Sequence, residues 1–190
     1  MDDKRYKKHP YFRTFDKNQE KFYPIYVGKH GFIKIFNPSF QSYLATAGYL
    51  TKRCKYYRVS LQFKHKKVSK YVHRLIADVW CNREVQGLKI VHHIDHNTKN
   101  NTCENLQWTT TSLNALMKKT SALNIKRNDG WYQSAFTFRG CKVLSIHLFK
   151  TAKEAKSYGL RLREKLYVNE RKNFINNALE QNSKSISITH

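Results

Sequence analysis

The chain has 190 residues, a length that suits one ordinary domain with a satellite or two small modules and excludes a large multidomain machine. Hydrophobic residues make up 40% of it, with 11 Phe, 12 Tyr and 3 Trp, which excludes a wholly disordered basic tail. The formal net charge is +23, from 36 Lys and Arg against 13 Asp and Glu. So large a charge repels itself in a compact state, and nucleic acid is the usual polyanion that neutralises it.

A membrane surface is the alternative polyanion. Twelve basic residues and no acidic one lie between Lys21 and Ala77, interleaved with Tyr and Phe in strand-like runs rather than in an amphipathic basic helix. No window approaches the roughly 18 apolar residues of a spanning helix, and no apolar stretch near the start suits a signal peptide. We therefore expect nucleic acid rather than membrane as the partner, and a cytoplasmic location.

The four cysteines stand at positions 54, 81, 103 and 141, so no Cys-x-x-Cys pair offers zinc-finger or redox spacing. Four unpaired thiols in a reducing compartment are the expectation.

The first half of the chain predicts strands followed by one helix. Residues 1–20 are polar and basic and suggest a flexible arm, with order beginning near Phe22. The runs 32–36 and 56–63 have the composition and alternation of strands. Apolar residues then recur at helical spacing, which predicts a short helix from His73 to about Cys81.

The central segment changes character within a few residues. An apolar run, 88–91, enters a polar loop rich in His, Asn and Asp, and a second apolar-containing run, 106–109, follows it. This pattern predicts two short strands around an irregular loop. Ser112 can cap a helix that runs from Leu113 to about Lys119, which places Asn114 in its first turn.

The remainder predicts a separate module. The runs 131–138 and 142–149 alternate like the two strands of a hairpin, and Thr151 and Glu154 have the spacing of a helix capping box. The expected division is a flexible basic arm (1–20), a first domain (21–119), a linker (120–128), a sheet-plus-helix module (129–178) and a frayed tail (179–190).

The central residues resemble the HNH endonucleases, and more closely the phage and intron-encoded homing type. The resemblance is carried by these residues and segments: Val91-His92-His93-Ile94-Asp95, Asn100-Asn101, Glu104-Asn105-Leu106-Gln107-Trp108, Asn114, and the preceding Val72-His73-Arg74-Leu75. It implies an α+β fold in which a ββα-metal finger follows N-terminal antiparallel strands. It also implies a metal-dependent enzyme that hydrolyses double-stranded DNA to 5′ phosphate and 3′ hydroxyl ends, in the host cytoplasm if a phage encodes it.

The resemblance assigns a role to each motif position. His93 is the candidate general base, because an imidazole titrates near neutrality and can deprotonate an attacking water. Asn105, through its side chain or its backbone carbonyl, would hold the second ring nitrogen of His93. Trp108 and Leu106 are expected to be core residues rather than surfaces for DNA stacking.

The resemblance places one divalent cation between His92 and Asn114. Relatives often have an acid at the first of these positions, so both ligands here are neutral and Mg²⁺ should bind weakly without DNA phosphate. Mg²⁺ and Mn²⁺ are the leading candidates, and imidazole ligation also admits Ni²⁺ or Zn²⁺. Asp95 is either a further metal contact or, as we favour, part of the loop structure. His96 stands where relatives often have Gly, so the loop has a different turn or His96 contacts phosphate.

Residues 124–132 together with 149–155 resemble the DNA-binding domain of plant ethylene-response factors. That domain lays a three-stranded sheet in the major groove with a helix behind it. Alternation places Trp131, Gln133, Thr137 and Arg139 on the face toward DNA, with Tyr132, Phe136 and Phe138 toward the helix. The candidate DNA contacts are Arg74, Lys126, Arg127, Trp131, Gln133, Arg139 and Lys142. The alternative is a small αβ module whose basic face is merely solvated.

Taken together, the residues and the resemblance predict an HNH DNA endonuclease that acts on double-stranded DNA, with a monomer favoured. A non-catalytic regulatory DNA-binding protein with a structural HNH finger, or an RNA-binding accessory protein, would share its charge.

Overall fold

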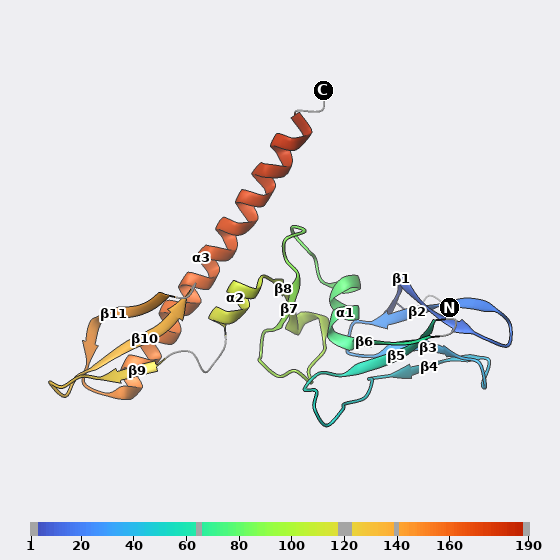
Figure 1. Ribbon diagram of the computed structural model, residues 1–190, viewed down its shortest axis with the longest axis horizontal. Helices are drawn as coiled ribbons and strands as arrows, with labels where there is room; N and C mark the ends of the chain where they lie inside the picture. Colours follow the sequence, from blue (N-terminus) through green and yellow to red (C-terminus); the bar gives the residue numbers. More distant parts are fainter. Residues whose placement is uncertain (1–3, 64–65, 118–122, 139–140, 188–190) are drawn as a thin grey trace. The chain divides into compact units, whose positions relative to one another are not determined.

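The computed structural model describes residues 4–63, 66–117, 123–138 and 141–187 (Figure 1). Within these residues the fold is mixed α and β, with several antiparallel sheets and few helices, which confirms the expected α+β class. The chain divides into two compact units. The first comprises Met1–Arg83 with Val91–Trp108, and the second comprises Glu84–Ile90 with Thr109–His190.

A four-stranded antiparallel meander forms most of the first unit. Its strands, in spatial order, are β1 (Tyr6–Asp16), β2 (Lys21–Gly28), β3 (Ile33–Asn37) and β4 (Ser42–Thr46). Ile25, Val27 and Ile33 are completely buried, as expected for the inward side chains of alternating strands. The expected strand at 32–36 is therefore confirmed as β3.

A hairpin and a short helix follow this sheet. The hairpin pairs β5 (Arg58–Phe63) with β6 (Lys66–Tyr71), and the helix is α1 (Val72–Trp80). Val72, Leu75 and Ile76 lie on the buried face of α1, so the apolar spacing that predicted this helix is the spacing that it buries.

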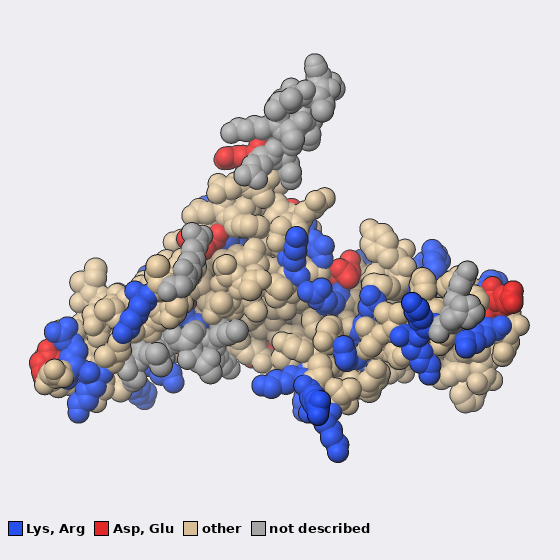
Figure 2. Space-filling view, viewed as in Figure 1, with Lys and Arg blue, Asp and Glu red and all other residues tan. Residues whose placement is uncertain are grey.

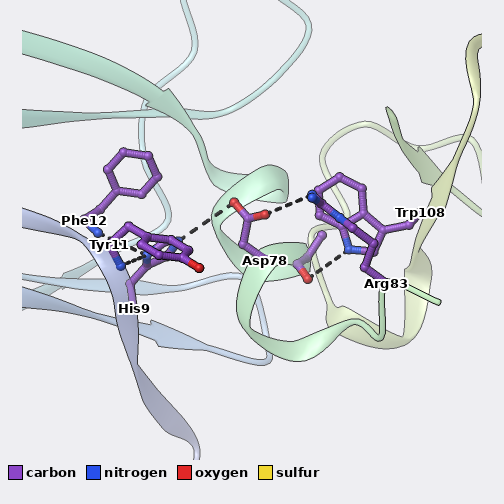
Figure 3. A network of polar contacts seen from close by, with 7 residues as sticks. His9, Tyr11, Phe12, Asp78, Arg83 and Trp108 are labelled. Carbon is purple, nitrogen blue, oxygen red and sulfur yellow. Dashed lines mark hydrogen bonds and ion pairs between the residues drawn. The ribbon is translucent and has the colours of Figure 1, made fainter. Parts of the chain in front are cut away.

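The N-terminal residues are not the flexible arm expected from their polarity, because residues 6–16 form β1 and pair with β2. Buried side chains hold β1 in place: His9 is 1% exposed, and its Nδ1 accepts the backbone N–H groups of Tyr11 and Phe12, each at 3.2 Å (Figure 3). The His9 ring also packs on the Phe12 ring, with centroids 4.8 Å apart.

Figure 3 shows how His9 faces α1 and, beyond it, the strand that carries Trp108. The His9 Nε2 lies 3.9 Å from a carboxylate oxygen of Asp78, which is too long for a hydrogen bond, and Asp78 pairs with Arg83 at 3.3 Å. The Arg83 guanidinium stacks 3.6 Å over the Trp108 ring, whose Nε1 donates to the Ala77 carbonyl at 3.2 Å. β1 is thus connected through α1 to Trp108.

We expect His9→Ala to destabilise the protein by about 2–4 kcal/mol, because the substitution removes a buried ring and the acceptor of two backbone N–H groups at the turn in β1. The measurement is the free energy of unfolding in urea. His147→Ala, at an exposed position of the second unit, is the control and should leave it within about 0.5 kcal/mol. Equal stability of the two variants would mean that β1 contributes little.

A three-stranded sheet and a long helix dominate the second unit. Its elements are α2 (Thr111–Leu116), β9 (Leu123–Lys126), β10 (Tyr132–Phe138), β11 (Cys141–Phe149) and α3 (Ala152–Ser187), with the strands in the order β11-β10-β9. Leu113, Leu116, Phe136 and Tyr167 form its buried core. The core explains why the division between units falls at Trp108 and not in the expected linker 120–128: α2 packs with β10 and α3.

Hydrogen bonds at the starts of α2 and α3 correct one expected helix cap and confirm the other. Thr110, not Ser112, caps α2, with its side chain accepting the Leu113 N–H at 3.2 Å. The capping box is confirmed by reciprocal bonds between Thr151 and Glu154, at 3.1 and 3.2 Å. The helix α3 continues through the expected frayed tail to Ser187, because no Gly or Pro follows Gly159 to interrupt it.

The four cysteines are free, as expected. Of the helices described, none has the length and apolar character needed to cross a bilayer.

Candidate functional site

His92, His93, Leu106 and Trp108 of the motif lie on a small two-stranded sheet. β7 (Ile90–His93) and β8 (Leu106–Thr109) pair, and a single 3₁₀ turn, η1 (Cys103–Asn105), leads into β8. The two short strands around an irregular loop are therefore confirmed. Leu106 and Trp108 are 5% and 2% exposed, so both are core residues and neither is available for stacking on DNA.

His93 is the last residue of β7 and its side chain is almost buried, with 4% exposed. Its Nε2 lies 3.1 Å from the side-chain oxygen of Asn101. Burial lowers the pKa of His93 below its ordinary value, although the Asn101 hydrogen bond and the Asp95 charge oppose the shift. With Asn101 as acceptor the ring proton sits on Nε2, so Nδ1 is the nitrogen that can take a proton.

Asn105 has a different role from the one expected. Its side-chain oxygen accepts the Asp95 N–H at 2.9 Å, and its amide donates to the Asp95 carboxylate at 2.9 Å and to the Asn100 carbonyl at 2.8 Å. Its backbone carbonyl accepts the Ile94 N–H at 2.9 Å. The asparagine that hydrogen-bonds to the His93 ring is Asn101, and the hydrogen bonds of Asn105 stabilise the loop that follows His93.

Asp95 is part of the loop structure, as favoured from the sequence. One carboxylate oxygen accepts the Asn97 N–H at 2.7 Å and the other accepts the Asn100 amide at 2.9 Å. The Asn100 amide, followed by the Asn97 N–H, lowers the pKa of Asp95 to about 2. The loop therefore keeps a carboxylate that is ionised and already bonded throughout the neutral range.

His96 occupies the turn that the sequence left open. Its φ is 62°, in the left-handed region where glycine is the usual residue. The chain therefore makes the glycine-type turn with a histidine, at a local backbone cost of about 1 kcal/mol or more. The His96 ring meets the His92 ring edge to face, with centroids 5.2 Å apart.

The rings of His73, Tyr56 and Tyr71 form a cluster next to His93. The His73 ring lies 5.2 Å from the His93 ring, and the Tyr56 ring lies 4.9 Å from His73 and 5.9 Å from His93. Tyr71 packs on His73 at 5.5 Å. His73 is 7% exposed, and its buried Nδ1 has no hydrogen-bond partner. Burial, followed by the charges of His93 and Arg74, lowers the pKa of His73 to about 3.

This environment predicts acid instability. The pKa of His73 is lower in the folded state than its ordinary value of about 6.5, so the unfolded state binds the proton first as pH falls. The stabilisation is complete above pH 6.5 and is lost progressively toward pH 3, by roughly 4–5 kcal/mol. We expect His73→Phe, which keeps a ring among Tyr56, Tyr71 and His93, to shift the acid unfolding midpoint to lower pH. Thermal unfolding followed from pH 7 to pH 3 measures the shift, and an unchanged midpoint would contradict it.

His92 precedes His93 on β7 and is 8% exposed. Asn114 is half-buried on α2, in the second unit. In the part of the chain that the structure describes, no group of three His, Cys, Asp or Glu side chains could hold a metal ion. His92 and Asn114 would offer neutral donors to a cation, and the nearby Asp95 carboxylate accepts hydrogen bonds within the loop.

The candidate DNA-contacting side chains differ in solvent exposure and in the partners they already have within the protein. Lys126, Lys142 and Arg74 are exposed, and Arg74 lies close enough to His73 to influence its pKa. Arg127 is exposed and pairs with Asp129 at 3.2 Å.

The remaining candidates lie on β10 or next to it. Trp131 is 38% exposed. Gln133 is half-buried and its amide donates to the Ser145 carbonyl at 2.6 Å, so its amide already has a partner within the sheet. The pairing of β10 with β11 also shifts register between Gln133 and Ala135. Arg139 lies outside the described residues.

Sequence reasoning missed Asn101, Tyr56 and the packing role of His73. Asn101 and His73 stand within the motif segments, but residue type and spacing do not show which asparagine reaches a ring. Tyr56 lies 37 positions before His93, and no sequence signal connects the two.

No family model and no curated protein matches the chain. Among solved structures, the chain is similar to one titled "DNA binding and cleavage by the HNH homing endonuclease I-HmuI". The two sequences are 23% identical over 65% of this chain and 76% of that chain, with a TM-score of 0.40. A TM-score of this size does not establish a shared fold, so the roles assigned to this chain depend on its own side chains.

Proposed function

We propose that the protein is a DNA endonuclease of the HNH type that hydrolyses phosphodiester bonds in double-stranded DNA, with His93 as the general base. The observation that carries the proposal is the His93 ring, held by Asn101 at 3.1 Å and kept unprotonated near neutral pH by burial. A neutral imidazole with one nitrogen bonded and the other able to accept a proton is what activation of a water requires.

The residues around His93 restrict how it can act. Asn101 fixes the ring orientation, and the loop bonds of Asn105 and Asp95 fix the position of Asn101 and its neighbours. Since Nε2 is the bonded nitrogen, Nδ1 removes the proton from water in line with the departing 3′ oxygen. The products would be a 5′ phosphate and a 3′ hydroxyl.

His92 and Asn114 are the residues that would hold a divalent cation, and the pairing of these two is supported by the sequence spacing alone. Their neutral donors suit an ion whose remaining ligands come from DNA phosphate, and they do not suit an ion held by the protein alone. Such an ion would supply positive charge near the leaving oxygen.

Calorimetric titration of the protein with Mg²⁺ or Mn²⁺ should detect binding of the metal when duplex DNA is present and little binding without DNA.

The charge supports DNA as the partner. The first unit carries twelve basic residues and no acidic one from Lys21 to Ala77. The second unit has exposed basic residues of its own, among them Lys126 and Lys142. Binding should weaken steeply with salt as condensed counterions are released.

The test is to incubate the protein with duplex DNA and Mg²⁺ or Mn²⁺, map the ends, and repeat with His93→Ala. Cutting that depends on His93 and yields 5′ phosphates supports the proposal. Absence of cutting by the unaltered protein under all metals would refute it.

A non-catalytic DNA-binding protein is the second candidate. It is favoured by the burial of His93, whose side chain is only 4% exposed before DNA binds. Duplex binding with no cleavage, unchanged by His93→Ala, would identify this alternative.

A further inference from the structure

The segment between β4 and β5, residues 51–57, is the most basic loop next to the His93 site. Lys52, Arg53 and Lys55 are all exposed, and the segment contains no acidic residue. Figure 2 shows Lys and Arg side chains gathered over the loop that follows β4, which Figure 1 draws at the lower edge.

The base of this loop is fixed rather than open. Tyr49 and Arg58 exchange two backbone hydrogen bonds, at 2.8 and 3.0 Å, which close the loop on itself. Gly48 makes the close approach possible: its φ is 88°, and a Cβ there would lie 2.6 Å from the Arg58 carbonyl oxygen. Within the loop, the Cys54 N–H donates to the Thr51 carbonyl at 3.0 Å. The three cations are therefore presented on a closed turn.

Two contacts join this turn to the site. The Thr98 hydroxyl, on the loop after His93, donates to the Lys55 carbonyl at 2.8 Å. The Tyr56 ring packs near both His73 and His93, at 4.9 and 5.9 Å between centroids. Lys55 is thus adjacent along the chain to Tyr56, whose ring lies beside the proposed base, and Arg53 and Lys52 precede Lys55 by two and three positions.

We propose that residues 51–57 form a phosphate-binding loop that holds the backbone of the cut DNA strand beside His93. Three exposed cations without a neighbouring acid complement successive phosphates, and Lys or Arg contacts of this kind set the register of a duplex without reading its sequence. The inference rests on the proposed nuclease function, because it places the scissile phosphate between this loop and His93.

The experiment uses the full chain and two triple variants of equal charge change. Lys52→Ala/Arg53→Ala/Lys55→Ala removes the cations of the loop. Lys17→Ala/Lys66→Ala/Lys67→Ala removes three exposed cations of the same unit, and Lys66 and Lys67 lie at the far end of the β5–β6 hairpin, about 15 Å from Arg58 along the strands. Two quantities are measured: the salt dependence of binding to a 30-base-pair duplex in EDTA, and the single-turnover cleavage rate at saturating DNA.

We expect the plot of log K against log salt to be less steep for the loop variant, with the magnitude of its negative slope smaller by about 2–3, because three phosphate contacts are lost. Its cleavage rate at saturating DNA should fall by about 30-fold or more, because the phosphate is no longer positioned. The control variant should cut at the wild-type rate once DNA is saturating.

A wild-type salt slope in the loop variant, or a cleavage rate equal to that of the control, would overturn the loop proposal. If the unaltered protein does not cut at all, the proposed function fails, and the salt slope measured in EDTA then decides the loop proposal by itself.

Discussion

His93→Ala is expected to slow DNA cleavage by about 10²–10⁴-fold while duplex affinity stays within about threefold of wild type. The substitution removes the imidazole that accepts the water proton, and it removes no charge that contacts phosphate. Binding is measured in EDTA and cleavage at saturating DNA, so that the two effects separate. His147→Ala, the same change at an exposed histidine of β11, should cut at the wild-type rate.

Two further measurements make this result specific to a base. Added imidazole should restore part of the rate of His93→Ala, since the truncated side chain leaves a space in which a free ring can act. In the wild-type protein, the acid limb of the rate should fall below pH 6.5, because burial lowers the pKa of His93. Neither rescue nor an acid limb is expected if His93 has only a structural role, and their joint absence would reject the assignment.

Asn105→Asp is expected to reduce cleavage strongly although the side-chain hydrogen bonds of Asn105 go to Asp95 and Asn100 rather than to the His93 ring. The change is nearly isosteric, but the new carboxylate cannot donate to the Asn100 carbonyl or to Asp95, and it faces the Asp95 carboxylate across 2.9 Å. Loss of two hydrogen bonds and the new repulsion between two carboxylates should destabilise the loop. We expect cleavage to fall by about 10²-fold, since the loop carries Asn101, which positions the ring.

Swapping the two groups provides the control. Asp95→Asn combined with Asn105→Asp restores one carboxylate and one amide across the same contact, so the double variant should recover part of the lost stability and activity. A coupling free energy of about 1–3 kcal/mol between the two positions is expected from a double-mutant cycle. Additive effects would mean that the Asn105 side chain does not act through Asp95.

Local patterns predicted the helix α1, the strand pair β7 and β8 and the capping box of α3, because each depends on contacts within a few residues. The sequence predicted that an asparagine side chain or carbonyl holds the His93 ring, but it did not identify which asparagine. Residue spacing brings several asparagines near His93, but only the folded loop, in which His96 has a left-handed backbone, shows that Asn101 lies against the ring and Asn105 against Asp95. The pairing of His92 with Asn114 in a metal site stays a prediction.

Distant contacts account for the other differences. The polarity of residues 1–20 predicted a flexible arm, whereas strand β1 is stabilised by pairing with β2 and by a buried His9 whose surroundings come from elsewhere in the chain. Tyr56 near His93 is likewise a product of the fold. The Ser- and Asn-rich composition after Leu179 suggested fraying, and α3 continues because nothing in its sequence terminates it. The likeness of β9–β11 and α3 to an ethylene-response-factor domain stays a prediction.

The connection from His9 through Asp78 and Arg83 to Trp108 has a practical consequence for dissection of the protein. A peptide that begins at β7 would contain His92, His93, Asn105 and Asn114. It would lack α1, whose Ala77 carbonyl accepts the Trp108 Nε1–H, and β1, whose His9 lies beside Asp78 of α1. Minimal fragments cut around the motif should therefore be poorly ordered, and a shortened derivative needs to retain the segment from β1 to α1 if its histidine loop is to keep its shape.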